Sequence, residues 1–212
     1  VQTRVVVLQD ASFCHLEGMT IAGGYFNGGG VSFYGSGVYI DNAYEAEIAS
    51  CMVTSNHIFG GNNTFAWGAG IVAYDSTVEM RDCVIQTNRI YLTGGAFTGV
   101  GYGAGLYIDS GRWRICRSVI LRNQNYVANL SGSMGAGIYI NNGSLAISNS
   151  LVCQNNCLAT SPTGDGLYIG INARATAVNC TIADNPGHGV YLQAGSPAMV
   201  ISNSIVWGNT AD

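Results

Sequence analysis

Apolar and polar residues alternate along this chain in short segments that recur in the same order. A first segment has the form Gly-x-Gly followed by three residues, as in GAGIYI at 135–140, and two further apolar segments follow it. The last of them ends in Asn, as in SNSLVCQN at 148–155. The first segment occurs six times, at 35–40, 68–73, 103–108, 135–140, 164–169 and 187–192. Self-similarity at this interval predicts a repeat protein.

Alignment of the segments places residues of one kind in columns. A β-branched column contains Ile21, Val53, Ile85, Ile120, Val152, Ile182 and Val206. Two residues earlier stand Met19, Cys51, Cys83, Ser118, Ser150, Cys180 and Ser204, most of them small. Apolar residues at every second position predict strands with one buried face, because side chains alternate across a pleated strand. No helical periodicity separates these segments.

The sequence therefore predicts an all-β fold in one domain over residues 1–212. We expect a single-stranded parallel β-helix, or solenoid, of about seven turns with three short strands per turn, in which each turn stacks on the last. Full repeats begin near residues 35, 68, 103, 135, 164 and 187. Asn tolerates a tight bend, and its amide can bond the same group in the next turn. The predicted structural ladder consists of Asn56, Asn88, Asn123, Asn155, Asn185 and Asn209.

The segments between each Asn and the next Gly-x-Gly vary in length, and we expect them to form a loop fringe at one corner of the rod. They span residues 57–67, 89–102, 124–134, 156–163 and 186. If the apolar residues of the first segment point inward, the tyrosines between them point outward. Such a column either binds a flat ligand, such as a sugar ring, or stacks across strands. It contains Tyr39, Tyr107, Tyr139, Tyr168 and Tyr191.

Together, the Gly-x-Gly strand, the small-residue column, the Asn column and the phrases LEGMTIAGG (16–24) and SNSIVWGN (202–209) resemble the right-handed parallel β-helix repeat family, which has the pectate-lyase-like fold. The resemblance covers residues 14–210 and is closest in character to bacterial cell-surface and secreted members. It implies a right-handed coil. It does not imply one function, since this fold serves lyases, hydrolases, epimerases, phage tailspikes and adhesins.

The composition excludes some classes of binding partner. Only 9% of the residues are charged, the basic residues are eight Arg and no Lys, and the net charge is −4. We therefore expect no nucleic-acid partner, and no apolar run is long enough for membrane insertion. Seven Cys without zinc-module spacing indicate buried thiols, although a local bridge between Cys153 and Cys157 stays open. We expect no metal and no cofactor.

One phrase carries a hint of catalysis. GHGVYLQAGS (187–196) is similar to a phrase of polygalacturonases, and this resemblance makes His188, with Asp165 at the equivalent position one turn earlier, a weak catalytic candidate. An inverting glycosidase needs two carboxylates, but the other matching positions hold Ala136 and Gly164. A lyase would need clustered carboxylates beside Arg, and the acidic residues look scattered. Asp82 and Arg117 share a bend column, which predicts a surface ion pair.

The N-terminal VQTRVVVLQD has neither an initiator Met nor the layout of a signal peptide, so we expect a mature form or a segment of a longer exported protein. The ends of a stacked rod expose core and strand edges, which continuation of the parent chain or self-association would cover. The sequence thus favours an extracellular or cell-surface structural or adhesive module that assembles end to end and offers its fringe to glycans or proteins. The alternatives are a polysaccharide hydrolase or lyase and a glycan-binding module without turnover.

Overall fold

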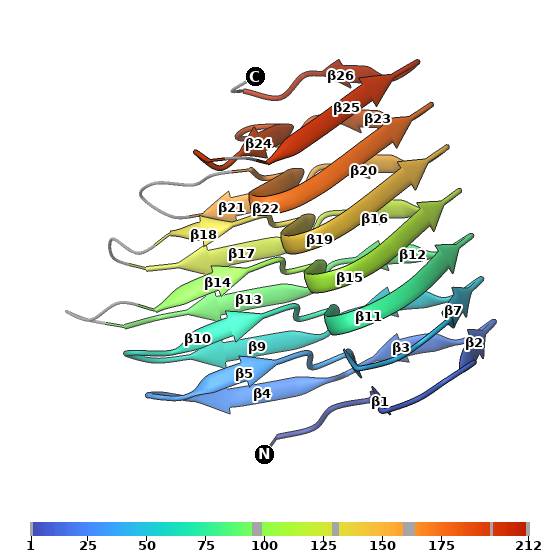
Figure 1. Cartoon of the computed structure of the whole chain (residues 1–212). Coiled ribbons are helices and arrows are strands. Elements are labelled where there is room, and N and C mark those ends of the chain that lie inside the picture. The colour runs from blue at the N-terminus through green and yellow to red at the C-terminus, as the bar shows by residue number, and fades with distance from the viewer. Residues whose placement is uncertain (1, 95–98, 129–131, 159–163, 196, 211–212) are drawn as a thin grey trace.

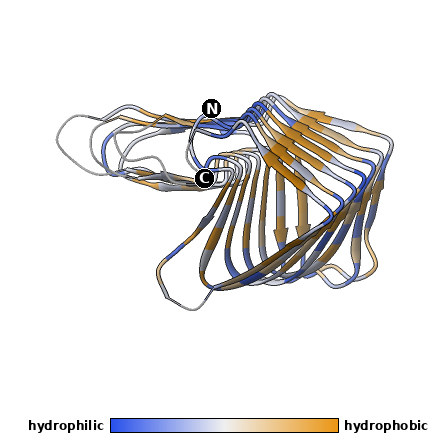
Figure 2. Cartoon of the chain, turned by 90° about the horizontal axis from the view of Figure 1, so that it is seen from above, coloured by the Kyte–Doolittle hydropathy of each residue, from blue (hydrophilic) through white to orange (hydrophobic). Residues whose placement is uncertain are grey.

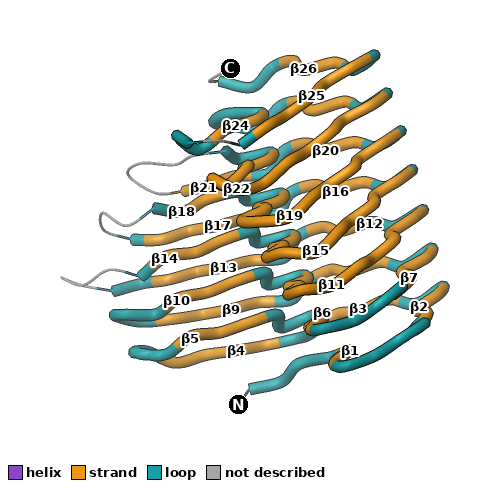
Figure 3. The backbone as a smooth tube through the Cα atoms, viewed as in Figure 1, coloured by secondary structure: helices purple, strands orange, loops and turns teal. Residues whose placement is uncertain are grey.

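The computed structural model describes residues 2–94, 99–128, 132–158, 164–195 and 197–210. Within these ranges the regular structure consists of β-strands in four parallel sheets, without a helix (Figure 1). Successive windings of the chain stack along one axis, with the N-terminal winding at one end and the C-terminal winding at the other (Figure 3). The chain is a parallel β-helix, and the predicted fold class is confirmed.

Two large sheets enclose the main core. The ten-stranded sheet contains β1 (Val6–Gln9), β2 (His15–Glu17), β6 (Val38–Asp41), β7 (Ala46–Ala49), β11 (Ile71–Arg81), β15 (Leu106–Cys116), β19 (Ile138–Ser148), β22 (Leu167–Val178), β24 (Val190–Leu192) and β25 (Ala198–Ser202). The seven-stranded sheet contains β3 (Thr20–Ala22), β8 (Met52–Thr54), β12 (Val84–Gln86), β16 (Val119–Leu121), β20 (Leu151–Cys153), β23 (Thr181–Ala183) and β26 (Ile205–Trp207).

Two smaller sheets form a flattened projection, which we call the side lobe (Figure 2). Its five-stranded sheet contains β4 (Tyr25–Gly28), β9 (His57–Gly60), β13 (Arg89–Leu92), β17 (Gln124–Val127) and β21 (Asn156–Leu158). Its four-stranded sheet contains β5 (Ser32–Tyr34), β10 (Phe65–Trp67), β14 (Val100–Tyr102) and β18 (Ser133–Met134).

The predicted columns lie in register. Ile85 pairs with Val53 on one side and with Ile120 on the other, and the column continues to Ile21 and Val206. Its middle members are fully buried in the main core. Figure 2 shows the result as stripes of apolar residues across adjacent strands. Because each winding buries its face against the next, the core is continuous along the rod.

The Asn ladder is also confirmed. The Asn123 side chain donates from Nδ2 to Oδ1 of Asn155 and to the carbonyl oxygen of Ile85, each at 3.0 Å, while its own Oδ1 accepts the backbone and side-chain N–H groups of Asn88. The same pattern repeats from Asn56 to Asn209. The residue before each ladder Asn has a positive φ, for example Arg122 at 54°, so the chain turns sharply at this bend.

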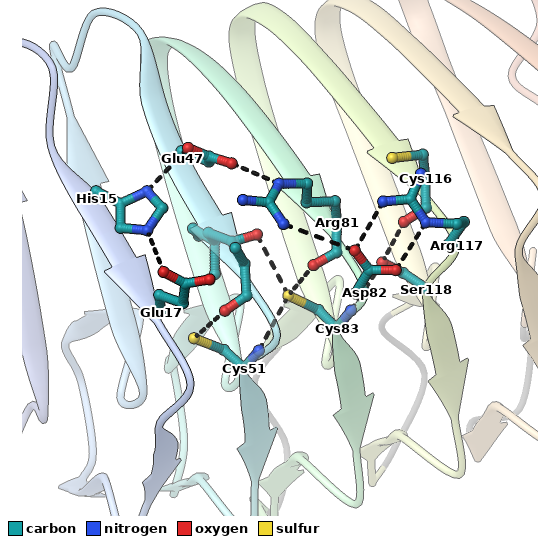
Figure 4. Close-up of polar contacts among 12 residues, drawn as sticks. His15, Glu17, Glu47, Cys51, Arg81, Asp82, Cys83, Cys116, Arg117 and Ser118 are labelled. Atoms are coloured by element: carbon teal, nitrogen blue, oxygen red, sulfur yellow. Dashed lines mark hydrogen bonds and ion pairs between the residues drawn. The ribbon is translucent and has the colours of Figure 1, made fainter.

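A second polar column lies at the bend that precedes the strands of the seven-stranded sheet, whereas the Asn ladder follows those strands. Cys83 and Ser118 each donate from the side chain to the carbonyl two residues earlier, Arg81 and Cys116 respectively. The backbone N–H of Cys83 donates to Ser118 Oγ at 3.1 Å, and that of Cys51 donates to Cys83 Sγ at 3.5 Å (Figure 4). Thiol and hydroxyl thus fill the same role, which explains the mixture of Cys and Ser at this position. All seven Cys are free thiols, Cys153 and Cys157 included.

Three predictions need correction. First, β11, β15, β19 and β22 join the first and middle segments into single strands of 11 or 12 residues, so most windings do not have three short strands. These strands bend through local irregularities such as Gly143, at a φ of 88°. Second, about five turns are full, rather than seven, because the described residues in the windings of β22 and β24 contribute no strand to the side lobe.

Third, the expected loop fringe is the side lobe and contains strands. Alternation in HIFG (57–60) and RIYL (89–92) places Ile58 and Ile90 in a small second core with Phe26, Phe33 and Val127. Parts of the fringe, residues 95–98, 129–131 and 159–163, lie outside the described residues. The lobe buries its own apolar face, so it is an extension of the fold instead of a set of independent loops.

Removal of one ladder amide tests its contribution. We expect Asn123→Ala to lower the free energy of unfolding by about 3 kcal/mol, because buried backbone groups of Asn88 and Ile85 lose their partners at about 1–3 kcal/mol each. Urea denaturation followed by circular dichroism measures this loss. Asn209→Ala is the matched control at the end of the ladder, where Asn209 is only half-buried and water can replace its bonds. Equal losses in the two variants would contradict the ladder's role.

Candidate functional site

Asp165 and His188 occupy equivalent positions in adjacent windings. Leu167 pairs with Val190, and the Gly166 N–H donates to the His188 carbonyl oxygen at 3.2 Å, which places the two candidates one above the other. Their environments differ. Asp165 is 1% exposed, whereas His188 is half-buried and packs edge-on against Tyr191 with ring centroids 5.3 Å apart.

Asp165 faces the interior of the side lobe. It stands in the same buried column as Ala69, Ala104 and Ala136, two of which contribute to the lobe core. Burial raises the pKa of its carboxyl group. Its Oδ1 has no hydrogen-bond partner in the described part of the chain. A second carboxylate, which glycoside hydrolysis requires, is not brought to this position by the described residues.

A polar cluster surrounds this carboxyl group inside the lobe. Asn125 and Cys157 are neighbours in paired strands, and Ser133 lies on β18 opposite Gly101, whose carbonyl accepts a hydrogen bond from Asn125 at 2.7 Å. Burial raises the pKa of the Cys157 thiol well above its usual range. The thiol therefore stays protonated, which makes it a poor nucleophile. The cluster has the character of a buried polar interior, not of an open reaction site.

The tyrosine column is packed against the side lobe. Tyr107, Tyr139 and Tyr168 are 4%, 5% and 4% exposed, and the rings of Tyr139 and Tyr168 stack with centroids 4.6 Å apart. Aromatic residues of the four-stranded sheet cover them, as the edge-on contact of Tyr102 with Tyr139 at 5.1 Å shows. The cluster contains Val72, Tyr107, Tyr139 and Tyr168, with Tyr34, Tyr39, Trp67, Tyr74, Tyr102, Met134 and Tyr191 against it.

Cross-strand stacking is therefore present in this column. Tyr39 and Tyr191, the half-buried members at its two ends, are the ones that a ligand would meet without movement of the lobe. Ligand contact by these tyrosines stays a prediction.

A shallow depression lies on the outer face of the ten-stranded sheet. It has a volume of about 360 Å³ and is lined by Glu45, Ala46, Glu47, Thr77, Val78, Glu79, Arg112 and Arg114. Glu79 lies between Glu47 and Arg114 in the register of three adjacent strands. The acidic residues that look scattered in the sequence are thus partly brought together beside arginine. The sequence holds a signal for this cluster. Met80 aligns with Ile48 and Ile115 in the repeat, so the residues one position earlier, Glu79, Glu47 and Arg114, align on the outer face.

A chain of ion pairs borders the depression. Glu47 binds Arg81 and also His15, whose other ring nitrogen contacts Glu17 at 3.0 Å (Figure 4). The hydrogen bond from Arg81 lowers the pKa of Glu47, and hydrogen bonds to Glu17 and Glu47 raise the pKa of His15.

The predicted pair of Asp82 and Arg117 is present as two hydrogen bonds of 2.7 Å. Such exposed pairs contribute little stability each. His15 is an ion-pair partner on the surface.

No set of three or more His, Cys, Asp or Glu side chains in the described ranges is arranged to hold a metal ion. The same residues include no helix with the length and apolar character of a membrane span. Neither observation adds a function to the surfaces described above.

The repeated windings, parallel sheets and internal ladders define a parallel β-helix repeat protein. Comparison with known families agrees: residues 127–212 match the family described as "Right handed beta helix region". This match supports the right-handed coil implied by the sequence. No match was found among curated proteins or among solved structures.

Burial of the tyrosine column predicts a loss of stability in alkaline solution. Burial raises the pKa of Tyr168 to about 12 and those of Tyr107 and Tyr139 further. The fold therefore favours the neutral phenols. Their contribution is complete below the ordinary pKa of about 10 and is lost as the pH rises through the folded pKa. We expect the urea midpoint to fall between pH of about 10 and 12.

The double variant Tyr139→Phe/Tyr168→Phe should show a smaller fall, because phenylalanine does not ionise. Urea curves at several pH values, together with ultraviolet titration of the phenols, check this result. Tyr44→Phe, at a ring that is 62% exposed, is the control and should follow the parent chain. A parent midpoint that does not change over this pH range would contradict the burial of the column.

Proposed function

We propose that this protein is a structural or adhesive β-helix module that works outside the cell or on its surface. The observation that carries the proposal is the continuity of the interior: aliphatic, asparagine and serine/cysteine columns run unbroken through the described windings. An interior of this kind suits a rigid spacer or display surface. The burial of Asp165 also weighs against catalysis by the Asp165–His188 pair.

Self-association at the rod ends belongs to the same proposal. Val206 is 37% exposed in the last described winding, although Ile182, its counterpart in the winding before, is fully buried. Nearby Ile201, Ile205 and Trp207 are exposed as well, and the opposite end exposes Val7 and Phe13.

A further winding would cover these groups and pair the open strand edges. It would come either from continuation of the parent chain or from a second copy stacked head to tail.

A charged side chain introduced at the C-terminal end of the rod tests end-to-end assembly. We expect the unsubstituted chain to form rods of increasing length as its concentration rises. Val206→Lys should remain monomeric, because lysine would place a charge in the stacked core. Sedimentation velocity and negative-stain electron microscopy measure the lengths. Met52→Lys is the matched control, since Met52 is also 37% exposed but lies in the side wall. An unsubstituted chain that stays monomeric at all concentrations would contradict end-to-end assembly.

A carbohydrate-active enzyme is the second candidate, and the depression on the ten-stranded sheet favours it. Glu45, Glu47 and Glu79 stand there beside Arg112 and Arg114, which is the combination of acid, base and cation that polysaccharide cleavage uses. Glu47 is held as a carboxylate by Arg81. This depression is a better location for such chemistry than the buried Asp165.

Incubation with polysaccharides separates the two candidates. Under the structural proposal the parent chain releases no new reducing ends and no unsaturated products from pectin, alginate or xylan. Cleavage that Glu79→Gln abolishes and Asp165→Asn retains would overturn the structural proposal and establish the depression as the site. Cleavage lost in Asp165→Asn or His188→Ala would instead point to the original pair. Circular dichroism verifies that each variant is folded.

A further inference from the structure

A polar groove follows the bend outside the Asn ladder, where the seven-stranded sheet meets the five-stranded sheet. It has a volume of about 560 Å³. Its lining residues are His57, Thr87, Asn88, Arg89, Arg122, Gln124, Gln154, Asn156, Asp184 and Pro186. They come from successive windings, from that of β9 to that of β23, so the groove runs parallel to the rod axis.

The lining forms two columns of hydrogen-bonding groups. One column holds the bend residues with positive φ, among them Thr87, Arg122 and Gln154, and the other holds the first residues of β13 and β17, Arg89 and Gln124. Because equivalent residues of adjacent windings lie about 4.8 Å apart, amide, hydroxyl and guanidinium groups repeat at short, even intervals. Amide and hydroxyl groups both donate and accept hydrogen bonds.

Two of these groups have polar atoms that the protein leaves unpaired. In the described residues, His57 Nδ1 and Arg89 Nε are buried and have no hydrogen-bond partner. A buried polar atom without a partner costs about 1–3 kcal/mol. Desolvation, followed by the charge of Arg89, lowers the pKa of His57, so its ring is neutral near pH 7. Both side chains are half-buried, so a ligand in the groove would contact their exposed atoms and not these two buried nitrogens.

A row of aromatic rings stands beside the groove. Phe59, Tyr91 and Tyr126 are two residues beyond the groove column on the same strands, so they share its outer face. Tyr91 and Tyr126 stack with centroids 4.6 Å apart, and the Arg89 guanidinium lies 4.6 Å from the centre of the Tyr91 ring. All three rings are half-buried. A ligand reaches these rings without moving the lobe, in contrast to the covered tyrosine column.

We propose that this groove binds a neutral, extended oligosaccharide that lies along the rod axis. A polymer of similar units matches donors and acceptors that repeat in each winding, and the apolar face of a sugar ring matches the accessible part of the half-buried Tyr91 and Tyr126 rings. A nucleic acid is a poor match for a chain with a net charge of −4. An extended peptide is also a poor match, because the groove crosses the strands and offers no free strand edge. The proposal requires neither end-to-end assembly nor cleavage.

Affinity gel electrophoresis with soluble xylan, glucomannan, dextran and polygalacturonate tests the groove. We expect at least one neutral polysaccharide to retard the parent chain. The double variant Gln124→Ala/Gln154→Ala and the variant Tyr126→Ala should each bind at least ten-fold more weakly. Tyr44→Ala is the matched control: its ring is exposed between β6 and β7 and does not line the groove, so retardation should be unchanged.

Three results would overturn the proposal. The first is that no neutral polysaccharide retards the chain, and the second is that Tyr44→Ala loses as much affinity as the groove variants. The third is retardation by polygalacturonate alone that high salt abolishes, which would reflect only the charges of Arg89 and Arg122. The glutamine variant changes surface side chains, and thermal melting verifies its fold. Because Val206→Lys leaves the groove intact, a monomeric variant that still binds polysaccharide separates failure of assembly from failure of binding.

Discussion

The stacking of backbone windings at one constant spacing is the constraint on which the rest of this structure depends. Parallel strands lie about 4.8 Å apart, so every inward side chain has the equivalent residue directly above and below it. A residue type is suitable only if it packs or hydrogen-bonds with itself at that distance. Isoleucine and valine meet this condition in the main core, and asparagine meets it at the bend, where Asn88, Asn123 and Asn155 hydrogen-bond in sequence.

The side lobe shows how the same constraint extends beyond the main core. Its strands keep the axial spacing of the windings from which they arise, so Ile58, Ile90 and Phe33 can form a second core only a few residues thick. Aromatic side chains fill the angle between the lobe and the ten-stranded sheet, with Tyr102 in contact with Tyr107 and Tyr139. These aromatic contacts hold the lobe against the ten-stranded sheet.

The sequence predicts those parts of the fold in which the windings align residue for residue. The columns of Ile85 and Asn123 are visible because each winding supplies one member at the same position of the repeat. The lobe is not predicted, since residues 57–67 and 89–102 differ in length and cannot be aligned throughout. The position of Asp165 is missed for a related reason: its column faces the lobe interior, and a residue is expected to be buried there only if the lobe has a core.

The candidate sites also divide into parts that align between windings, which the sequence predicts, and parts that do not align, which it does not predict. Stacking of Tyr139 on Tyr168 could be anticipated from the repeat, but the burial of both rings depends on Tyr102 and Met134, which arrive from the unaligned segments. The depression at Glu79 and the groove at Gln124 are built from outward positions, where the repeat imposes no common residue type. Their chemistry becomes visible only when neighbouring windings are placed side by side.

The Asn ladder is indifferent to how much chain separates its members. Asn155 and Asn185 are 30 residues apart, Asn185 and Asn209 are 24 residues apart, and Asn88 and Asn123 are 35 residues apart, yet the amide contacts stay between 3.0 and 3.3 Å. Insertions at the tip of the lobe therefore leave the axis of the rod unchanged. Evolution, or a protein engineer, can exchange one exposed epitope per winding while the scaffold beneath keeps its pitch.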